Sequence, residues 1–420
     1  MPYGVCALRV SASPRRISMT SGLTPFRWPA SWKDASSLAL LGGTPFDCLV
    51  CGKGAPAAVL NQKSFTVADP ATPPAGVQIT EGVWPGVEMA RGQAAASSGP
   101  TGNPWVDSNG WKICLEAALH PELRVWVDAK PAEGRALAAS YPRTIADCAA
   151  YGGRWIVTLD DALAGGVAQG NAGALAAWKK IAGAARFFND RKAWSGYAPV
   201  AVLGIVSSFS GDNEYMGQEL LNLVARTNQQ LGIVLADKPA SFAGLRAVIY
   251  PDVKPPAPEL RARIMAFVQS GGTLITGPNW GAPPGTPSTG PDQPGYTWRA
   301  AGEGRVAFAQ AEFDDPYVVA NEATLIVSHR YDSVRFFNAG SAGSFYTAAP
   351  DGSRAVVQML FYTDRAATDV TVRVAGKYRT GKLWTLDGAE PSPIDMDLQK
   401  DAVELHLPSV FQYAAAELEA

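Results

Sequence analysis

The chain has 420 residues, a net charge of −2 and 47% hydrophobic residues. This length predicts two or three domains, each with a sizeable core. The near-zero charge and scattered Lys and Arg argue against a partner made of nucleic acid or an anionic membrane surface. No apolar run approaches the ~20 residues of a transmembrane helix.

The cysteines argue against a disulfide framework, because an odd number spread through apolar segments predicts free buried thiols. They are Cys6, Cys48, Cys51, Cys114 and Cys148. The Cys48–Cys51 spacing is typical of metal ligands, but no second pair or nearby histidine completes a site. We therefore predict no bound metal and no cofactor.

Residues 1–19 do not make a convincing signal peptide. They contain two adjacent arginines but lack an apolar core and a small-residue cleavage site. We expect a poorly ordered leader, or a start placed upstream of the true one. Two locations stay open, the cytoplasm and secretion directed by a signal peptide missing from this sequence.

The first region, residues 20–195, alternates between apolar strands and helices. Strands are expected at 46–50, 77–81, 123–128 and 154–161, and helices at 31–41, 111–118, 142–151 and 174–189. This alternation predicts a mostly parallel sheet with crossover helices. Acidic residues end three of the strands: Glu81, Asp128 and the adjacent pair Asp160 and Asp161.

This pattern predicts a (β/α) barrel-like domain, in which functional side chains lie at the carboxyl ends of the strands. The alternative is that each acid caps the helix that follows it. Three such acids together, each with a tryptophan nearby, favour a site. A full barrel takes about 250 residues, and about 170 lie between Gly22 and Lys192. We therefore expect a barrel that is contracted, or incomplete at its N-terminal side.

Tryptophan is concentrated in this region, because nine of the twelve precede residue 200. Core filling accounts for part of them, while flat aromatic rings also stack on the apolar faces of sugars. A long polar loop, 91–109, is expected to overhang the strand ends. The candidate substrate-binding residues are Trp84, Glu88, Arg91, Trp105, Asp107, Trp126 and Trp155. The charged members of this set are alternatively plain solvated residues.

The second region, residues 196–282, is a compact α/β unit. The continuous apolar run at 199–206 is typical of a strand buried on both faces. Further strands are expected at 231–235, 247–250 and 271–276, with helices at 216–230 and 258–270. We predict a flavodoxin-like, mostly parallel sheet.

The segments PVAVLGIVSS and LRAVIYPDVKPPAPELRARIMAFVQSGGTLITGP, with their spacing, resemble the glutamine-amidotransferase-like middle domain of multidomain glycoside hydrolases such as the family 42 β-galactosidases. The resemblance covers about a fifth of the chain. Residues 199–278 contain no cysteine, so amidotransferase chemistry is excluded there. In those hydrolases the middle domain follows a catalytic barrel, which implies that the chemistry lies upstream.

The third region, residues 300–420, changes to period-two, β-branched patterning. Strands are expected at 305–308, 333–337, 355–361, 369–374 and 402–407. This pattern predicts a β-sandwich. It resembles the C-terminal β domains of the same hydrolases, which are usually structural.

These features predict a glycoside hydrolase acting on an oligosaccharide or polysaccharide. Hydrolysis of a glycosidic bond needs a proton donor and a second carboxylate that attacks or activates water. The candidate catalytic residues are Glu81, Asp128 and Asp160, with Asp161 as the substitute, since one of two adjacent residues must point away. Trp126 lies on the same side of its strand as Asp128, and an apolar wall favours the protonated form of a carboxyl.

Two other functions are compatible with the pattern. A non-catalytic carbohydrate-binding protein with a degenerate barrel would explain the short barrel. A sugar isomerase or lyase would need metal ligands or a histidine base, and only three histidines are present, far apart in sequence. A homo-oligomer stays open.

Overall fold

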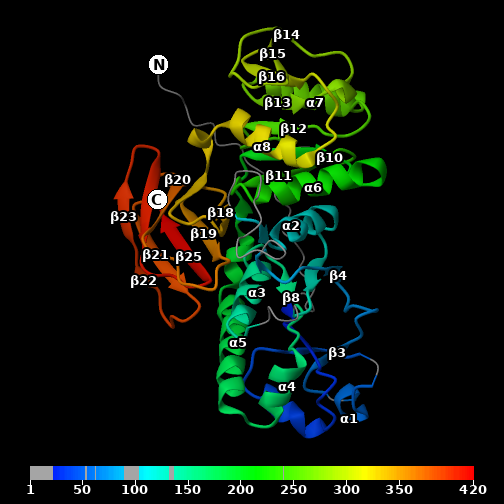
Figure 1. Cartoon of the computed structure of the whole chain (residues 1–420), viewed down its shortest axis with the longest axis vertical. Coiled ribbons are helices and arrows are strands. Elements are labelled where there is room, and N and C mark those ends of the chain that lie inside the picture. The colour runs from blue at the N-terminus through cyan, green and yellow to red at the C-terminus, as the bar shows by residue number, and fades with distance from the viewer. Residues whose placement is uncertain (1–21, 53, 62, 89–103, 132–136, 240) are drawn as a thin grey trace.

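The computed structural model describes residues 22–52, 54–61, 63–88, 104–131, 137–239 and 241–420 (Figure 1). The N-terminal region lies at the bottom of the view and an α/β unit at the top, with a β-sandwich at the left. Within the described residues, no helix is long and apolar enough to cross a membrane.

The N-terminal region contains six short parallel strands. They are β1 (Pro25–Arg27), β2 (Cys48–Val50), β3 (Thr66–Ala68), β4 (Val77–Glu81), β7 (Arg124–Asp128) and β8 (Arg154–Trp155). They pair in the orders β1-β2-β3 and β4-β7-β8. Just beyond β8, Val157 forms a parallel bridge to Phe26. The last strand therefore lies beside the first, as it does in a barrel.

In the described part of the chain, these strands form a barrel-like arrangement that is open on one side. Among the described residues, no pairing joins β3 to β4. Strand β1 pairs with β2 on one edge and with Val157 on the other, so the gap among the described residues lies between β3 and β4. The sequence pattern missed β1, since a strand of three residues carries too little alternation to be recognised.

Helices cover the outside of the strands. They are α1 (Ala57–Leu60), α2 (Gly110–Leu119), α3 (Ser140–Ala149), α4 (Asp161–Ala168) and α5 (Ala172–Asp190). The same region contains the 3₁₀ turns η2 (Ala35–Leu41) and η3 (Lys192–Gly196) and an antiparallel ribbon of β5 (Gly86–Val87) and β6 (Val106–Asp107). Helix α5 buries Trp178, Ile181, Ala185 and Phe188. These residues recur every three or four positions, so one face of α5 packs on the core.

The α/β unit is a seven-stranded sheet in the order β11-β10-β12-β13-β16-β15-β14. Its strands are β10 (Leu203–Ser207), β11 (Leu231–Leu235), β12 (Ala247–Ile249), β13 (Thr273–Thr276), β14 (Thr286–Pro287), β15 (Tyr296–Ala301) and β16 (Gly304–Ala309). Its helices are α6 (Glu214–Ala225), α7 (Pro258–Gln269) and α8 (Pro316–Val327), with the 3₁₀ turns η4 (Gly211–Asn213), η5 (Pro278–Trp280) and η6 (His329–Tyr331). The five parallel strands follow the flavodoxin-like order.

The predicted boundaries at 282 and 300 need correction. Strand β16 pairs in parallel with β13, so it belongs to the α/β sheet and not to the sandwich. Its Val306 and Ala307 are both fully buried, as expected where helices cover both faces of a sheet. A period-two pattern identifies a strand but cannot say which sheet it joins.

The sandwich consists of a six-stranded sheet, β22-β21-β25-β19-β18-β9, and a four-stranded sheet, β17-β20-β24-β23. Its strands are β17 (Val334–Phe337), β18 (Ala342–Ala348), β19 (Arg354–Phe361), β20 (Val370–Ala375), β21 (Thr380–Thr385), β22 (Ser392–Pro393), β23 (Asp395–Leu398), β24 (Ala402–Leu407) and β25 (Tyr413–Glu419). The edge strand β9 (Ala198–Pro199) comes from the segment before the α/β unit. This segment therefore ties the sandwich to the first half of the chain.

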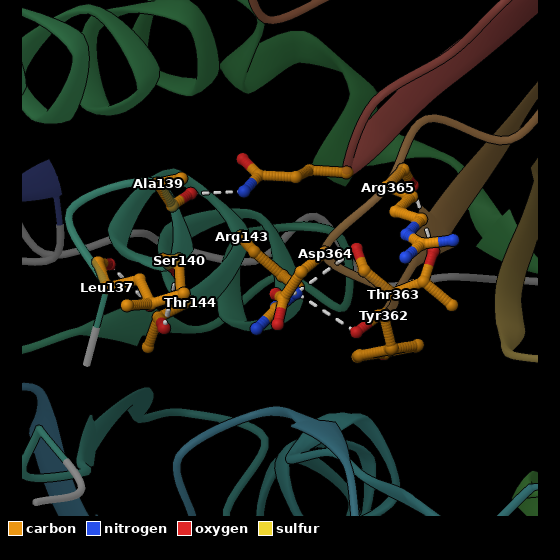
Figure 2. Close-up of polar contacts among 10 residues, drawn as sticks. Leu137, Ala139, Ser140, Arg143, Thr144, Tyr362, Thr363, Asp364 and Arg365 are labelled. Carbon is orange, nitrogen blue, oxygen red and sulfur yellow. Dashed lines mark hydrogen bonds and ion pairs between the residues drawn. The ribbon is translucent and has the colours of Figure 1, made fainter. Parts of the chain in front are cut away.

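Helix α3 joins the barrel to the sandwich through a buried arginine. Arg143 donates to the carbonyl of Tyr362 at 3.0 Å and forms an ion pair with Asp364 at 2.9 Å. Figure 2 shows Arg143 reaching from α3 to the segment that contains both residues. In the same contact, Gln412 donates to the carbonyl of Ala139.

Asp147, one turn further along α3, is completely buried in this contact. It accepts hydrogen bonds from the Tyr362 hydroxyl at 2.8 Å and from the Asn109 side chain at 2.8 Å. Burial raises the pKa of Asp147 to about 6, although these hydrogen bonds and the charge of Arg143 oppose the shift. The folded protein therefore holds a proton here more tightly than the unfolded chain.

We predict that stability depends on pH through Asp147. As the pH rises from about 4 to about 6, the wild type should lose up to about 3 kcal/mol of unfolding free energy relative to Asp147→Asn. The reason is that the folded state must give up a proton that the unfolded state has already lost. Urea unfolding of both proteins across this range measures the difference. A wild type that gains relative stability as pH rises would contradict the prediction.

Candidate functional site

The interior of the barrel is apolar and is closed at one end by a layer of polar side chains. Trp126 is completely buried there together with Cys48, Val50 and Ile156. Residues two apart on a strand face the same side. Asp128 therefore follows Trp126 on the interior face, one step closer to the carboxyl end of β7.

Glu81 belongs to the same layer. It follows Ile79, which packs against the interior cluster, and its register partner on β7 is Asp128. Neighbouring strands lie about 4.8 Å apart, so the two carboxyl groups start from adjacent positions on one edge of the sheet. The register places the backbone positions of these two acids next to each other, and their shared role stays a prediction.

Arg27 adds a positive charge to this layer. On β1, Phe26 packs among the rings outside the strands, so Arg27 faces inward. Its guanidinium forms an ion pair with Asp128 at 2.7 Å and donates to the Thr158 hydroxyl at 3.2 Å. Both members of the pair are partly exposed, 21% for Arg27 and 26% for Asp128.

This ion pair changes the role expected for Asp128. The sequence suggested a proton donor beside Trp126, whereas the contact with Arg27 suits a nucleophile or base. One Asp128 oxygen is bound by Arg27, and the other, Oδ1, is buried with no partner among the described residues.

Asp160 does not belong to the layer as a free carboxylate. Its Oδ1 accepts from the backbone N–H of Leu163 at 2.8 Å, which caps the start of α4. Its Oδ2 accepts from the Tyr141 hydroxyl at 2.6 Å. Asp161 is exposed in the first turn of α4. The catalytic prediction for both residues is therefore corrected in favour of helix capping.

The tryptophans expected to stack on sugar are core residues. Trp84 and Trp155 pack edge to face with ring centroids 5.6 Å apart, and Trp126 fills the barrel interior. Trp155 also donates to the carbonyl of Ala129 at 2.8 Å. A tryptophan close to an acid in sequence therefore need not face the same side of the sheet, since Trp155 points away from the barrel interior.

The arms of the long loop dock on the α/β unit. The Arg226 guanidinium, at the end of α6, lies 3.9 Å from the centroid of the Trp105 ring and 3.7 Å from Asp107. The Trp105 ring N–H also donates to Asp107 at 3.2 Å, and the backbone N–H of Glu88 donates to the backbone carbonyl of Trp105. Trp105 and Asp107 therefore serve a domain contact, which corrects their assignment to sugar. Arg91 lies outside the described residues.

The predicted absence of a metal remains a prediction. Within the described ranges, no group of three or more His, Cys, Asp or Glu side chains is placed to hold a metal ion. Cys48 and Cys51 are free and buried. Burial raises the pKa of the Cys48 thiol to about 12, so it is a packed, unreactive group.

Sequence reasoning missed Arg27 and Thr158. Arg27 lies in a short segment with no recognisable strand pattern, and Thr158 lies just before the candidate acids Asp160 and Asp161. In both cases the apolar residue just before, Phe26 or Val157, faces outward, so the polar residue faces inward. This alternation can be recognised only when the pairing of Phe26 with Val157 is known.

No protein-family model and no curated protein matches the chain. Among solved structures, α-L-fucosidase isoenzyme 2 from Paenibacillus thiaminolyticus has a TM-score of 0.50 and 11% identity, covering 77% of this chain and 64% of that chain. A rhamnosidase from Novosphingobium sp. PP1Y also has a TM-score of 0.50 and 11% identity, covering 89% of this chain and 37% of that one. A family 42 β-galactosidase from G. stearothermophilus has a TM-score of 0.48 and 11% identity, covering 82% and 60%.

The chain therefore resembles multidomain glycoside hydrolases in its fold. At 11% identity the likeness concerns the fold alone. The chain also spans less than two thirds of the fucosidase and rhamnosidase chains.

The capping role of Asp160 is testable against its neighbour. Asp160→Ala should lower the unfolding free energy by about 1–2 kcal/mol, because it removes an N-cap and the acceptor of the Tyr141 hydroxyl. Asp161→Ala, a matched change at an exposed position, should stay within about 0.5 kcal/mol of the parent. Urea denaturation measures both. Equal losses in the two variants would contradict the assignment.

Proposed function

We propose that the protein is a glycoside hydrolase that uses Glu81 and Asp128 as its pair of carboxyl groups. The observation that carries the proposal is their register pairing on adjacent parallel strands, at the carboxyl ends and facing the barrel interior. This is the end of a barrel where enzymes place their functional groups. The substrate class proposed is an oligosaccharide or polysaccharide.

The surroundings of the two carboxyl groups suggest different roles. Asp128 is paired with Arg27 at the carboxyl end of β7, so it is the proposed nucleophile or base. Glu81 is exposed and is the proposed proton donor to the leaving oxygen. Glu88 remains a candidate for binding sugar hydroxyls.

A second candidate function is a non-catalytic carbohydrate-binding protein with a degenerate barrel. The six-stranded barrel, open between β3 and β4 in the described part of the chain, is the observation that favours it. In that case the ion pair of Arg27 and Asp128 would hold a sugar hydroxyl without any bond being broken.

The catalytic pair is tested by substitution and by a matched acid. Asp128→Asn and Glu81→Gln should each lower turnover at least 10²-fold, since acid–base catalysis contributes on the order of 10²–10⁴-fold. Asp69→Asn is the control, because Asp69 also follows a strand but comes after the inward-facing Ala68 and so points away from the interior. It should retain the parent rate.

The assay is hydrolysis of aryl fucosides and rhamnosides, followed by a wider panel of aryl glycosides and polysaccharides. Near-normal rates in both strand-end variants would show that the site assignment is wrong. A parent that cleaves nothing on the panel but binds oligosaccharide in calorimetry would support the binding protein instead.

A further inference from the structure

Strand β4, which carries Glu81, is held on its outer face by a row of polar side chains from α2. Glu116 accepts from Gln78 at 2.5 Å and from Thr80 at 3.3 Å. Lys112, one turn earlier on the same face of the helix, donates to the carbonyl of Glu81 at 2.7 Å. Because β4 pairs only with β7 in the described residues, these contacts supply restraint that a second neighbouring strand would give.

Asn109, directly before α2, continues this row beyond the end of β4. Its side chain accepts from the backbone N–H of Val83 at 2.8 Å and donates to the carbonyl of Val83 at 2.9 Å. Gly82, between Glu81 and Val83, has no room for a side chain. A Cβ there would lie 2.6 Å from the Asn109 side-chain oxygen and 2.2 Å from Val127. The turn that follows Glu81 is therefore fitted closely to Asn109.

Asn109 is in turn fixed by groups from two other parts of the chain. Asp147 accepts from its backbone N–H at 3.0 Å and from its side chain at 2.8 Å. The second oxygen of Asp147 accepts from the hydroxyl of Tyr362, which belongs to the sandwich. All three residues are at most 3% exposed. A continuous series of hydrogen bonds, buried from Tyr362 to Asn109 and partly buried at Val83, thus connects the sandwich to the backbone two residues from Glu81.

We propose that Asn109 is a positioning residue for Glu81, and that the sandwich sets its position through Tyr362 and Asp147. This inference rests on the proposed hydrolase site and concerns how its carboxyl groups are held in place. A displacement of about 1 Å at a reacting group can cost on the order of 10²-fold in rate. Loss of the series should therefore lower kcat more than it raises KM.

The test compares two buried tyrosines of the sandwich. Tyr362→Phe removes the hydroxyl that holds Asp147, whereas Tyr413→Phe removes a hydroxyl that donates to Gln358 at 2.8 Å, outside the series. With the aryl glycoside that the parent cleaves best, Tyr362→Phe should lower kcat about tenfold and change KM less than about twofold. Tyr413→Phe, with a comparable loss of stability, should keep both parameters.

A second readout does not depend on activity. Amide hydrogen exchange of a peptide covering residues 78–84 should be faster in Tyr362→Phe than in the parent and in Tyr413→Phe. Equal exchange in the two variants would overturn the positioning role, and so would faster exchange with an unchanged kcat. If the parent cleaves no substrate, the proposed hydrolase fails, while the exchange rates still decide whether Tyr362 holds the turn after Glu81.

Discussion

The open side of the barrel is the constraint on which the arrangement of the candidate site depends. A parallel strand in a closed barrel is fixed by a neighbour on each edge, but β4 pairs only with β7 in the described residues. The missing restraint is supplied by α2, whose Lys112 and Glu116 bind β4 from outside, and by Asn109 beyond its end. Polar contacts suit this task because each has a defined direction, whereas apolar packing alone would let a short edge strand slide.

The same need for fixed geometry explains the buried charges at the domain contacts. Arg143 reaches Asp364 and the Tyr362 carbonyl, and Arg191 on the barrel side lies 3.9 Å from the centroid of the Trp384 ring in the sandwich. A planar guanidinium donates hydrogen bonds to oxygen acceptors that lie in its plane, and its flat face stacks on aromatic rings. Such contacts give the N-terminal region and the sandwich a defined relative orientation, in addition to the apolar cluster that the two share.

Part of this fold and site could be predicted from local pattern. The strand ending at Glu81 has the expected bounds, and the strand ending at Asp128 begins one residue later than expected, because a clear stop follows each. Asp160 had the same appearance in the sequence, yet it caps α4, since its side chain points back to a backbone N–H three residues on. Local pattern could not separate these acids, because capping and catalysis use the same residue type at the same place after a strand.

The sequence by itself determined the α/β alternation, the change to period-two patterning and the positions of acids at strand ends, because hydrophobic periodicity follows directly from backbone geometry. Only the tertiary structure decided which sheet β16 joins, that Arg27 faces Asp128, and that Tyr362 reaches Asp147. These contacts join residues from about 30 to more than 200 positions apart. Their geometry is set by how whole sheets and helices pack, and no short stretch of sequence contains that information.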